Sequence, residues 1–273
     1  MTSLTEKLET VKNILAASGG AVIAYSGGVD STLLAKVAHD VLGEKALMVT
    51  AASIFFGESE TEAAVGLAKE LGFVHLLIHL DLETKEQVLA NPPERCYYCK
   101  QELIAGLKEI ANSHNLPCIF DGSNADDVSD YRPGQLAAKE QGVRSPLQEA
   151  GLTKSEIREL AKMYNLPTWD KPSLACLASR IPYHERITKE KLQMTDKAEE
   201  FLRKLGFTQL RVRLHGTLAR IEILPQELQR IINEADKINN YLKTLGYTYV
   251  TVDLQGYRTG SLNEVLPIAK ENL

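Results

Sequence analysis

The residues best suited to chemistry form one short string, Ser26-Gly27-Gly28-Val29-Asp30-Ser31, directly after the apolar run at 21–24. The two glycines let the backbone turn tightly and approach a ligand. Amide groups at the start of the following helix point at an anion there, and the helix dipole also favours negative charge. Ser26 and Ser31 add hydroxyl donors, and Asp30 is placed to hold a magnesium ion. The string therefore predicts an ATP site rather than an ordinary turn.

Two other phosphate-binding loops are excluded by inspection, because neither G-x-x-x-x-G-K-[ST] nor G-x-G-x-x-G occurs in the chain. The string instead resembles the SGGxDS signature of the PP-loop enzymes. That resemblance implies cleavage of ATP between the α and β phosphates, an adenylated intermediate and release of pyrophosphate. The residues predicted to bind ATP and its Mg²⁺ are Ser26, Gly27, Gly28, Asp30 and Ser31.

Alternating strands and helices have to position this string. The predicted strands lie at 21–25, 46–51, 74–79 and 118–121, and the predicted helices at 31–42, 58–71, 101–114 and 154–164. Such alternation with right-handed crossovers gives a parallel sheet covered on both faces. The predicted fold class is α/β, a Rossmann-like PP-loop domain of the adenine nucleotide alpha hydrolase type, at residues 1–185.

Ligands of parallel sheets bind where the strands end. Ser53 follows the second strand and Gly122 follows the fourth, so both are predicted to line the adenosine pocket, with turn chemistry as the alternative. Arg144 is a candidate phosphate ligand, and a solvated arginine is the alternative. Asp126 and Asp127 are candidate second magnesium ligands, again with turn chemistry as the alternative.

The pattern changes after an irregular linker at 167–186. The later predicted helices lie at 190–205 and 227–245, and the strands at 209–214, 218–223 and 247–254. This order predicts a smaller α+β domain at residues 186–273, which we expect to serve in substrate binding or oligomerisation.

Three cysteines are candidates for sulfur or metal chemistry. Cys96 and Cys99 form a C-x-x-C pair and Cys176 lies far along the chain, whereas Cys118 is interpreted as a buried residue of a strand. The three thiols fit a zinc site, a redox pair, or three ligands of a 4Fe-4S cluster with one iron left open. A pair that merely begins a helix is the plain alternative.

Several further strings resemble the LarE family of ATP-dependent sulfur transferases. They are Asp130-Tyr131-Arg132-Pro133-Gly134, Gly142-Val143-Arg144-Ser145-Pro146-Leu147, Cys176-Leu177-Ala178-Ser179-Arg180 and Arg211-Val212-Arg213. The resemblance implies a role in building the nickel-pincer nucleotide cofactor of lactate racemase. It also implies the substrate, pyridinium-3,5-biscarboxylic acid mononucleotide. ATP adenylates a carboxylate, and a sulfur nucleophile then displaces AMP to leave a thiocarboxylate.

The source of sulfur differs between branches of that family. In one branch a single cysteine at the position of Cys176 gives up its own sulfur, and those members lack the C-x-x-C pair. This chain is similar to the three-cysteine branch, which implies that Cys96, Cys99 and Cys176 hold a 4Fe-4S cluster carrying an extra sulfide. Such a cluster is oxygen-sensitive, so an aerobic preparation can lack it. Sacrificial donation by Cys176 remains the alternative.

Arginines suit the substrate's phosphate and carboxylates, because a guanidinium matches both in bidentate fashion. The predicted substrate-binding residues are Ser179, Arg180, Glu199, Arg211 and Arg213. Arg211 and Arg213 share one face of a predicted strand, and a solvated face is their alternative. An exposed helix face is the favoured interpretation of Glu199 and Glu200, against one that orients an arginine or accepts a proton.

Composition limits the class of partner. The net charge is −5 and the pI is about 5.8, which disfavours a long nucleic acid as partner. No apolar run approaches membrane length, and the first residues have helical spacing rather than a signal peptide, so we expect a cytoplasmic protein without a membrane partner. The resemblance implies a homo-oligomer and neighbouring enzymes of the nickel-pincer pathway. A cluster-dependent tRNA thiolase, an amidating synthetase and a non-catalytic ATP-binding or cluster-carrier protein remain alternatives.

Overall fold

The computed structural model describes residues 3–129, 133–172 and 175–266. Packing divides the chain into two compact units, one of Met1–Val88 with Glu94–Leu174 and the other of Leu89–Pro93 with Ala175–Leu273. Each unit has its own apolar core. The short 89–93 segment belongs to the second unit because the Asn91 amide donates to the carbonyls of Ile181, Pro182 and Glu185 at 3.2, 2.7 and 3.2 Å. The functional division at residue 185 stays a prediction.

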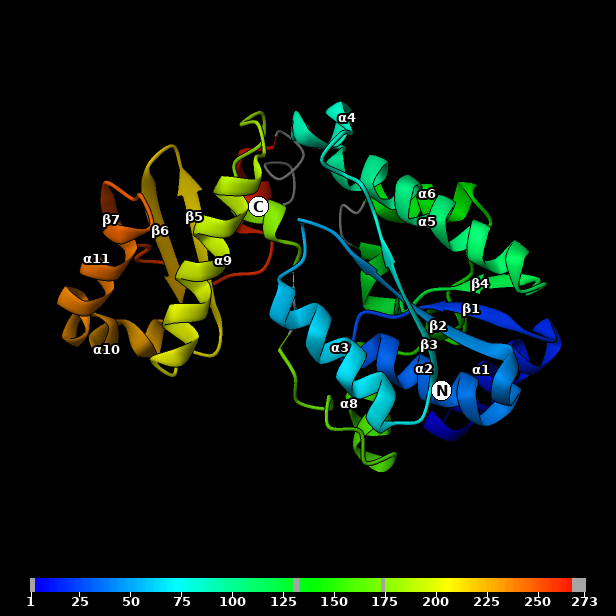
Figure 1. The fold of residues 1–273 in the computed structure, drawn as a ribbon. Helices are drawn as coiled ribbons and strands as arrows, with labels where there is room; N and C mark the ends of the chain where they lie inside the picture. The colour runs from blue at the N-terminus through cyan, green and yellow to red at the C-terminus, as the bar shows by residue number, and fades with distance from the viewer. Residues whose placement is uncertain (1–2, 130–132, 173–174, 267–273) are drawn as a thin grey trace. The chain divides into compact units, whose positions relative to one another are not determined.

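A parallel sheet forms the centre of the first unit. Its described strands are β1 (Ala21–Ala24), β2 (Ala46–Ala52), β3 (Val74–His79) and β4 (Cys118–Phe120), in the order β3-β2-β1-β4 (Figure 1). Ile23 of β1 is in register with Met48 of β2 and Phe120 of β4. The sheet confirms the predicted α/β fold class, and all its strands end at the edge where the phosphate loop begins.

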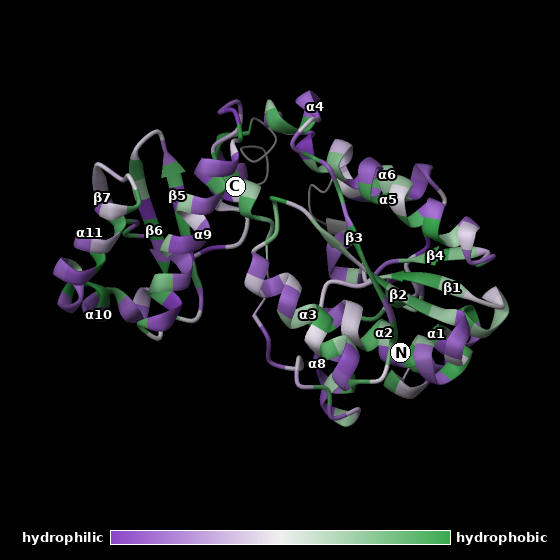
Figure 2. Cartoon of the chain, in the orientation of Figure 1, coloured by the Kyte–Doolittle hydropathy of each residue, from purple (hydrophilic) through white to green (hydrophobic). Residues whose placement is uncertain are grey.

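Helices cover both faces of this sheet. They are α1 (Leu4–Ser18), α2 (Val29–Leu42), α3 (Glu58–Glu70), α5 (Arg95–Ser113), α6 (Pro133–Glu140), α7 (Pro146–Glu149) and α8 (Lys154–Met163). The short helix α4 (Glu86–Leu89) ends where the chain first leaves this unit. Side chains alternate along a strand, so Ile23 packs among residues of α1, α2, α3 and α8, while Val22 packs against α5 and α6. The strands are accordingly apolar and the outer helix faces polar (Figure 2).

One predicted helix start agrees with the structure and another differs from it. Thr153 caps α8 with a capping box to Glu156, as the sequence predicts. Helix α5, in contrast, begins at Arg95 rather than at residue 101. Its N-cap, Glu94, makes no side-chain capping bond, so the start carries no capping signal. The longer helix places the C-x-x-C pair inside its first turns.

The second unit is a small α+β structure, as predicted. It contains α9 (Lys189–Lys204), β5 (Leu210–His215), β6 (Leu218–Ile223), α10 (Leu228–Asn233), α11 (Ala235–Thr244) and β7 (Tyr249–Val252). Strand β6 pairs antiparallel with β5 and parallel with β7. The helix predicted over 227–245 is interrupted at Glu234, whose ψ of 9° departs from the helical value.

Candidate active site

The phosphate loop joins β1 to α2 through a backbone that only glycine suits. Gly27 has φ +67°, and a Cβ there would lie 2.9 Å from the Cβ of Ala64 on α3. Gly28 is the N-cap of α2 and has no side chain to occupy the helix end. The backbone amides at the start of α2 are therefore placed to receive an anion.

The two serines of the loop lie together. Their hydroxyl oxygens are 3.1 Å apart, the Ser26 N–H donates to Ser31 Oγ at 3.2 Å, and the Ser31 hydroxyl donates to the Gly28 carbonyl at 3.2 Å. Both hydroxyls therefore face the interior of the loop. They can turn toward a phosphate without a change of backbone.

Asp30 faces a cation that the sequence patterns do not predict. Lys154, the first residue of α8, pairs with the Asp30 carboxylate, and the Asn124 amide approaches it at 3.5 Å. The carboxylate is therefore already paired with one cation, and its role as a magnesium ligand stays a prediction. Asp127 accepts the Asn124 N–H at 3.0 Å, which is the turn chemistry of the alternative interpretation. Asp126 instead accepts the Lys154 N–H at 2.8 Å, a long-range bond to the start of α8.

A second lysine reaches the loop from the segment after α8. Lys171 Nζ donates to the Gly27 carbonyl at 2.9 Å. Burial lowers the pKa of Lys171, and the nearby charge of Glu60 acts in the opposite direction. The half-buried ammonium of Lys171 lies beside the backbone of the phosphate loop and is placed to bind a polyphosphate.

We expect Lys171→Met to weaken ATP binding by at least about tenfold, the effect of losing one charge-assisted hydrogen bond. Isothermal titration calorimetry with ATP measures this change. Lys36→Met is the control, because Lys36 lies on α2 and pairs with exposed Asp40 one turn along the same helix. Equal affinities of the parent and the Lys171 variant would contradict the assignment.

Ser53 and Gly122 follow β2 and β4 at the same edge. A Cβ on Gly122 would lie 3.0 Å from the Ser31 nitrogen, so the backbone of this loop rests directly on the start of α2. The Ser53 hydroxyl accepts the Phe55 N–H at 3.2 Å. Their place at the adenosine remains a prediction.

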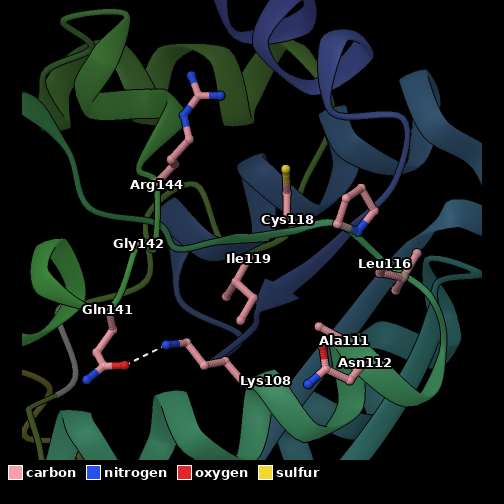
Figure 3. A pocket seen from close by; sticks show the side chains of 10 residues that line it. Lys108, Ala111, Asn112, Leu116, Cys118, Ile119, Gln141, Gly142 and Arg144 are labelled. Atoms are coloured by element: carbon pink, nitrogen blue, oxygen red, sulfur yellow. Dashed lines mark hydrogen bonds between the residues drawn. The ribbon is translucent and has the colours of Figure 1, made fainter.

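Arg144 lies beside the edge strand β4. Its N–H donates to the Ile119 carbonyl, and its guanidinium pairs with Glu149. It lines a cavity of about 280 Å³ with Lys108 and Cys118, in which no residue of the phosphate loop takes part (Figure 3). The phosphate role of Arg144 stays a prediction.

The cysteine pair opens α5. Cys96 is exposed and Cys99 is half-buried, and their spacing places both on one side of the helix. Arg95 Nη2 lies 3.9 Å from Cys96 Sγ. Gly134 of α6 approaches closely, since a Cβ there would lie 3.3 Å from the Cys96 carbonyl. The pair therefore fits thiolate ligation of iron; Asp130, Tyr131 and Arg132 of the adjoining family string lie outside the described residues.

Cys176 belongs to the second unit, at the start of the 3₁₀ turn Leu177–Arg180. It is half-buried. Across residues 3–129, 133–172 and 175–266, no three His, Cys, Asp or Glu side chains are gathered for a metal ion. Convergence of Cys176 with the pair on α5 remains a prediction.

The backbone around Cys176 is held by Arg180. Nη1 of this arginine donates to the carbonyls of Ala175 and Cys176 at 2.8 and 3.1 Å. It also donates to the Ser179 hydroxyl at 3.0 Å. Nε and Nη2 donate to the two carboxylate oxygens of Glu199 at 2.7 Å each. The guanidinium, 2% exposed, thus connects the cysteine segment to helix α9.

Glu199 is completely buried, whereas the favoured expectation is an exposed helix face. That expectation is wrong for Glu199 and correct for Glu200, which is exposed and pairs with Lys204. Glu199 also accepts the Val212 N–H at 3.0 Å and a bond from Arg203 at 2.9 Å. Burial disfavours its charge, but these donors together with Arg180 prevail and lower its pKa. The contacts match the interpretation in which this glutamate orients an arginine.

The two strand arginines share one face of β5, and both are buried rather than solvated. Arg213 donates to both oxygens of Glu222 at 3.1 and 2.9 Å and to the Ser179 carbonyl at 2.6 Å. Arg211 lies 5.3 Å from the ring centroid of Tyr257. Burial and the charge of Arg180 lower the pKa of Arg211. Their contact with a substrate stays a prediction.

Comparison with known proteins places these features in a family. A family model described as NAD synthase matches residues 3–94, which contain the phosphate loop. The chain is 45% identical over 265 residues to an uncharacterized protein of Synechocystis sp., covering 96% of this chain and 99% of that protein. It is 37% identical over 271 residues to the pyridinium-3,5-bisthiocarboxylic acid mononucleotide synthase of Lactiplantibacillus plantarum, covering 99% of this chain and 98% of the synthase.

The likeness to a tRNA-modifying enzyme is more distant. The tRNA-specific 2-thiouridylase MnmA of Rickettsia rickettsii is 27% identical over 202 residues, covering 59% of this chain and 54% of that enzyme. Within residues 3–129, 133–172 and 175–266, no helix is both long and apolar enough to cross a bilayer. Because its identity to the synthase extends over almost the full length of both chains, this protein belongs to the LarE family of PP-loop, ATP-dependent sulfurtransferases.

Proposed function

We propose that this enzyme converts a carboxylate of pyridinium-3,5-biscarboxylic acid mononucleotide into a thiocarboxylate during synthesis of the nickel-pincer nucleotide. The observation that carries this proposal is the match, over nearly the whole of both chains, to a synthase named for the corresponding bisthiocarboxylic acid. The phosphate loop supports this proposal, because the loop offers glycine amides, two serine hydroxyls and Asp30 to a nucleoside triphosphate.

The reaction has two steps. In the first, a substrate carboxylate oxygen attacks the α-phosphorus of ATP, the bond to the bridging oxygen breaks and pyrophosphate leaves. Amides at the start of α2 and Lys171 stabilise the charge that develops on pyrophosphate. Asp30 would hold a magnesium ion, which when bound would add further charge stabilisation there. In the second, a sulfur nucleophile attacks the acyl carbon of the adenylate, and AMP leaves as the carbon–sulfur bond forms.

We propose that Cys96, Cys99 and Cys176 hold a 4Fe-4S cluster. When bound, the cluster would supply a sulfide held as an anion at the iron that no cysteine ligates. On the protein side, the first turn of α5 presents two thiols, and Arg180 fixes the backbone at the third. We also propose that the chain forms a homo-oligomer and that it exchanges substrate and product with other enzymes of the nickel-pincer pathway.

Anaerobic iron and sulfide analysis tests the cluster. We expect about four irons per chain in the parent and loss of iron in Cys96→Ala, Cys99→Ala and Cys176→Ala. Cys118→Ala is the matched control and should keep its iron, because Cys118 lies in strand β4. Little iron after reconstitution would contradict the cluster and make Cys176 the candidate sacrificial donor.

The reaction itself is followed by pyrophosphate release and by mass spectrometry of the product. With ATP and the pyridinium substrate, we expect replacement of a carboxylate oxygen by sulfur, and more than one product per chain when sulfide is supplied. A single turnover that converts Cys176 to dehydroalanine would support sacrificial donation. No pyrophosphate release with this substrate would contradict the proposed function.

A further inference from the structure

The phosphate loop and the cysteine pair are joined by a short chain of contacts within the first unit. Its centre is Asp121, which follows β4 and is 4% exposed. Lys100, the residue after Cys99 on α5, donates from Nζ to Asp121 Oδ2 at 2.9 Å. This ion pair connects the helix of the cysteines to the loop after the edge strand.

Both oxygens of Asp121 are engaged. The Ser145 hydroxyl donates to Oδ1 at 2.6 Å, and the Ser123 N–H donates to the same oxygen at 3.2 Å. The carboxylate is therefore fixed on the loop side by neutral donors, and Lys100 supplies the positive charge that a buried carboxylate needs. A shift of this loop has to move Lys100 or break the pair.

On its other side the loop touches the phosphate site. Gly122 adjoins Asp121, and a Cβ on Gly122 would lie 3.0 Å from the nitrogen and 3.2 Å from the Cα of Ser31. The space between this loop and the start of α2 is too small for a side chain at position 122. A phosphate that binds the amides and hydroxyl of Ser31 therefore acts on a backbone in direct contact with Gly122.

At the far end, Lys100 shares the first turns of α5 with the cysteines. Those turns are backed by α6, where Gly134 approaches the Cys96 carbonyl and Tyr97 Oη donates to Glu140 at 2.6 Å. Lys100 directly follows Cys99 in this helix, so a shift of the Lys100 backbone also shifts Cys99. The path from Ser31 to Cys99 thus consists of one backbone contact and one ion pair.

We propose that Lys100 is a positioning residue that couples ATP in the phosphate loop to the geometry of the Cys96–Cys99 pair. The inference rests on the proposed function, in which both sites serve one reaction. It gives the enzyme a means of adjusting the sulfur-bearing ligands when ATP is present. Coupling of this kind is reciprocal, so a change at the cysteines alters nucleotide affinity by the same factor.

Thiol modification measures the coupling without substrate or cluster. The full chain is freed of iron and treated anaerobically with iodoacetamide, with and without saturating magnesium α,β-methylene-ATP. Peptide mass spectrometry then gives the modification rates of Cys96 and Cys99. We expect nucleotide to slow modification of Cys99 by about fivefold or more in the parent. In Lys100→Met, nucleotide should slow modification of Cys99 by less than about twofold. In Lys100→Arg, which keeps the charge, the slowing should be as large as in the parent.

Lys108→Met is the matched control. Lys108 lies on the same helix, but its ammonium donates to Gln141 Oε1 and lines the cavity of Figure 3. This variant should respond to nucleotide as the parent does. The coupling would be overturned if nucleotide left the Cys99 modification rate of the parent unchanged. It would also be overturned if nucleotide slowed this modification in Lys100→Met as much as in the parent. Failure of the proposed function is a separate result, since it appears as absent thiocarboxylate product while these rates remain measurable.

Discussion

Replacing Glu199 by glutamine is expected to destabilise the second unit by about 3–5 kcal/mol, the usual cost of leaving one partner of a buried ion pair unpaired. The substitution keeps the shape of the side chain but removes the charge that faces Arg180 and Arg203. Arg180 then remains buried without its carboxylate. Differential scanning calorimetry should show a thermal transition lowered by at least about 10 °C.

The next residue provides the control. Glu200→Gln removes the same charge from the same helix, but Glu200 is exposed and pairs with exposed Lys204. Surface pairs of this kind contribute about 0–1 kcal/mol, so the transition should hardly move. If both variants unfolded at the same temperature as the parent, Glu199 would not support the unit.

The Glu199 effect should also depend on pH. The pKa of Glu199 is lowered in the folded protein, so its contribution is fully present above the unfolded value near 4.5. It is lost as the pH falls through the lowered folded value. The stability difference between the parent and Glu199→Gln should therefore be largest near neutral pH and should shrink in acid.

The same variant bears on the chemistry of Cys176. Arg180 donates to the carbonyls of Ala175 and Cys176 from one side of its guanidinium while Glu199 binds the other side, so we expect loss of the Glu199 charge to loosen the cysteine segment. Below its melting temperature, Glu199→Gln should change the rate at which iodoacetamide modifies Cys176, and Glu200→Gln should not. A lowered melting temperature with an unchanged rate would assign Glu199 to folding alone.

Gly27→Ala is expected to reduce ATP-dependent pyrophosphate release by roughly a hundredfold or more, because small misplacements of a catalytic loop have effects of that size. The methyl group would meet Ala64 Cβ at 2.9 Å, and the φ of +67° is unfavourable for alanine. The loop must shift, and its amides then no longer point at one phosphate position. Pyrophosphate release and ATP affinity should fall together.

Two variants separate the causes of this loss. Gly19→Ala imposes a comparable φ of +70° where no heavy atom lies within 4 Å of the added carbon, so ATP-dependent activity should survive. Adding Ala64→Gly to Gly27→Ala removes the 2.9 Å contact with the Ala64 Cβ, while the 3.0 Å approach to the Ala64 Cα and a backbone strain of about 1–2 kcal/mol remain. Partial recovery is the expected result, and full activity of Gly27→Ala alone would contradict the assigned loop geometry.

Local patterns predicted the first unit well because each signal lies within a few residues. The apolar run before Ser26 forms β1, and the capping box at Thr153 begins α8. Helix α5 begins before the predicted start, and Glu94 makes no side-chain capping bond that would mark its first residue. Its first turns pack against Gly134 of α6, a contact distant in sequence that local patterns do not contain.

Long-range partners were beyond sequence patterns. Lys154 and Lys171 reach the phosphate loop from more than a hundred residues away, and nothing in their neighbourhoods marks them. Glu199 looks like one of several charges on α9, and only the Arg180 contacts explain its burial. The roles of the cysteines and arginines toward cluster and substrate remain predictions.

The 89–93 segment determines how the two units are encoded along the gene. Since it packs with the second unit, the polypeptide passes between the units three times, after residues 88, 93 and 174. No single stretch of gene therefore encodes the second unit whole. A fragment beginning at residue 175 would lack Asn91 and its bonds to the carbonyls of Ile181, Pro182 and Glu185. A single crossover between relatives therefore cannot exchange one whole unit and leave the other intact.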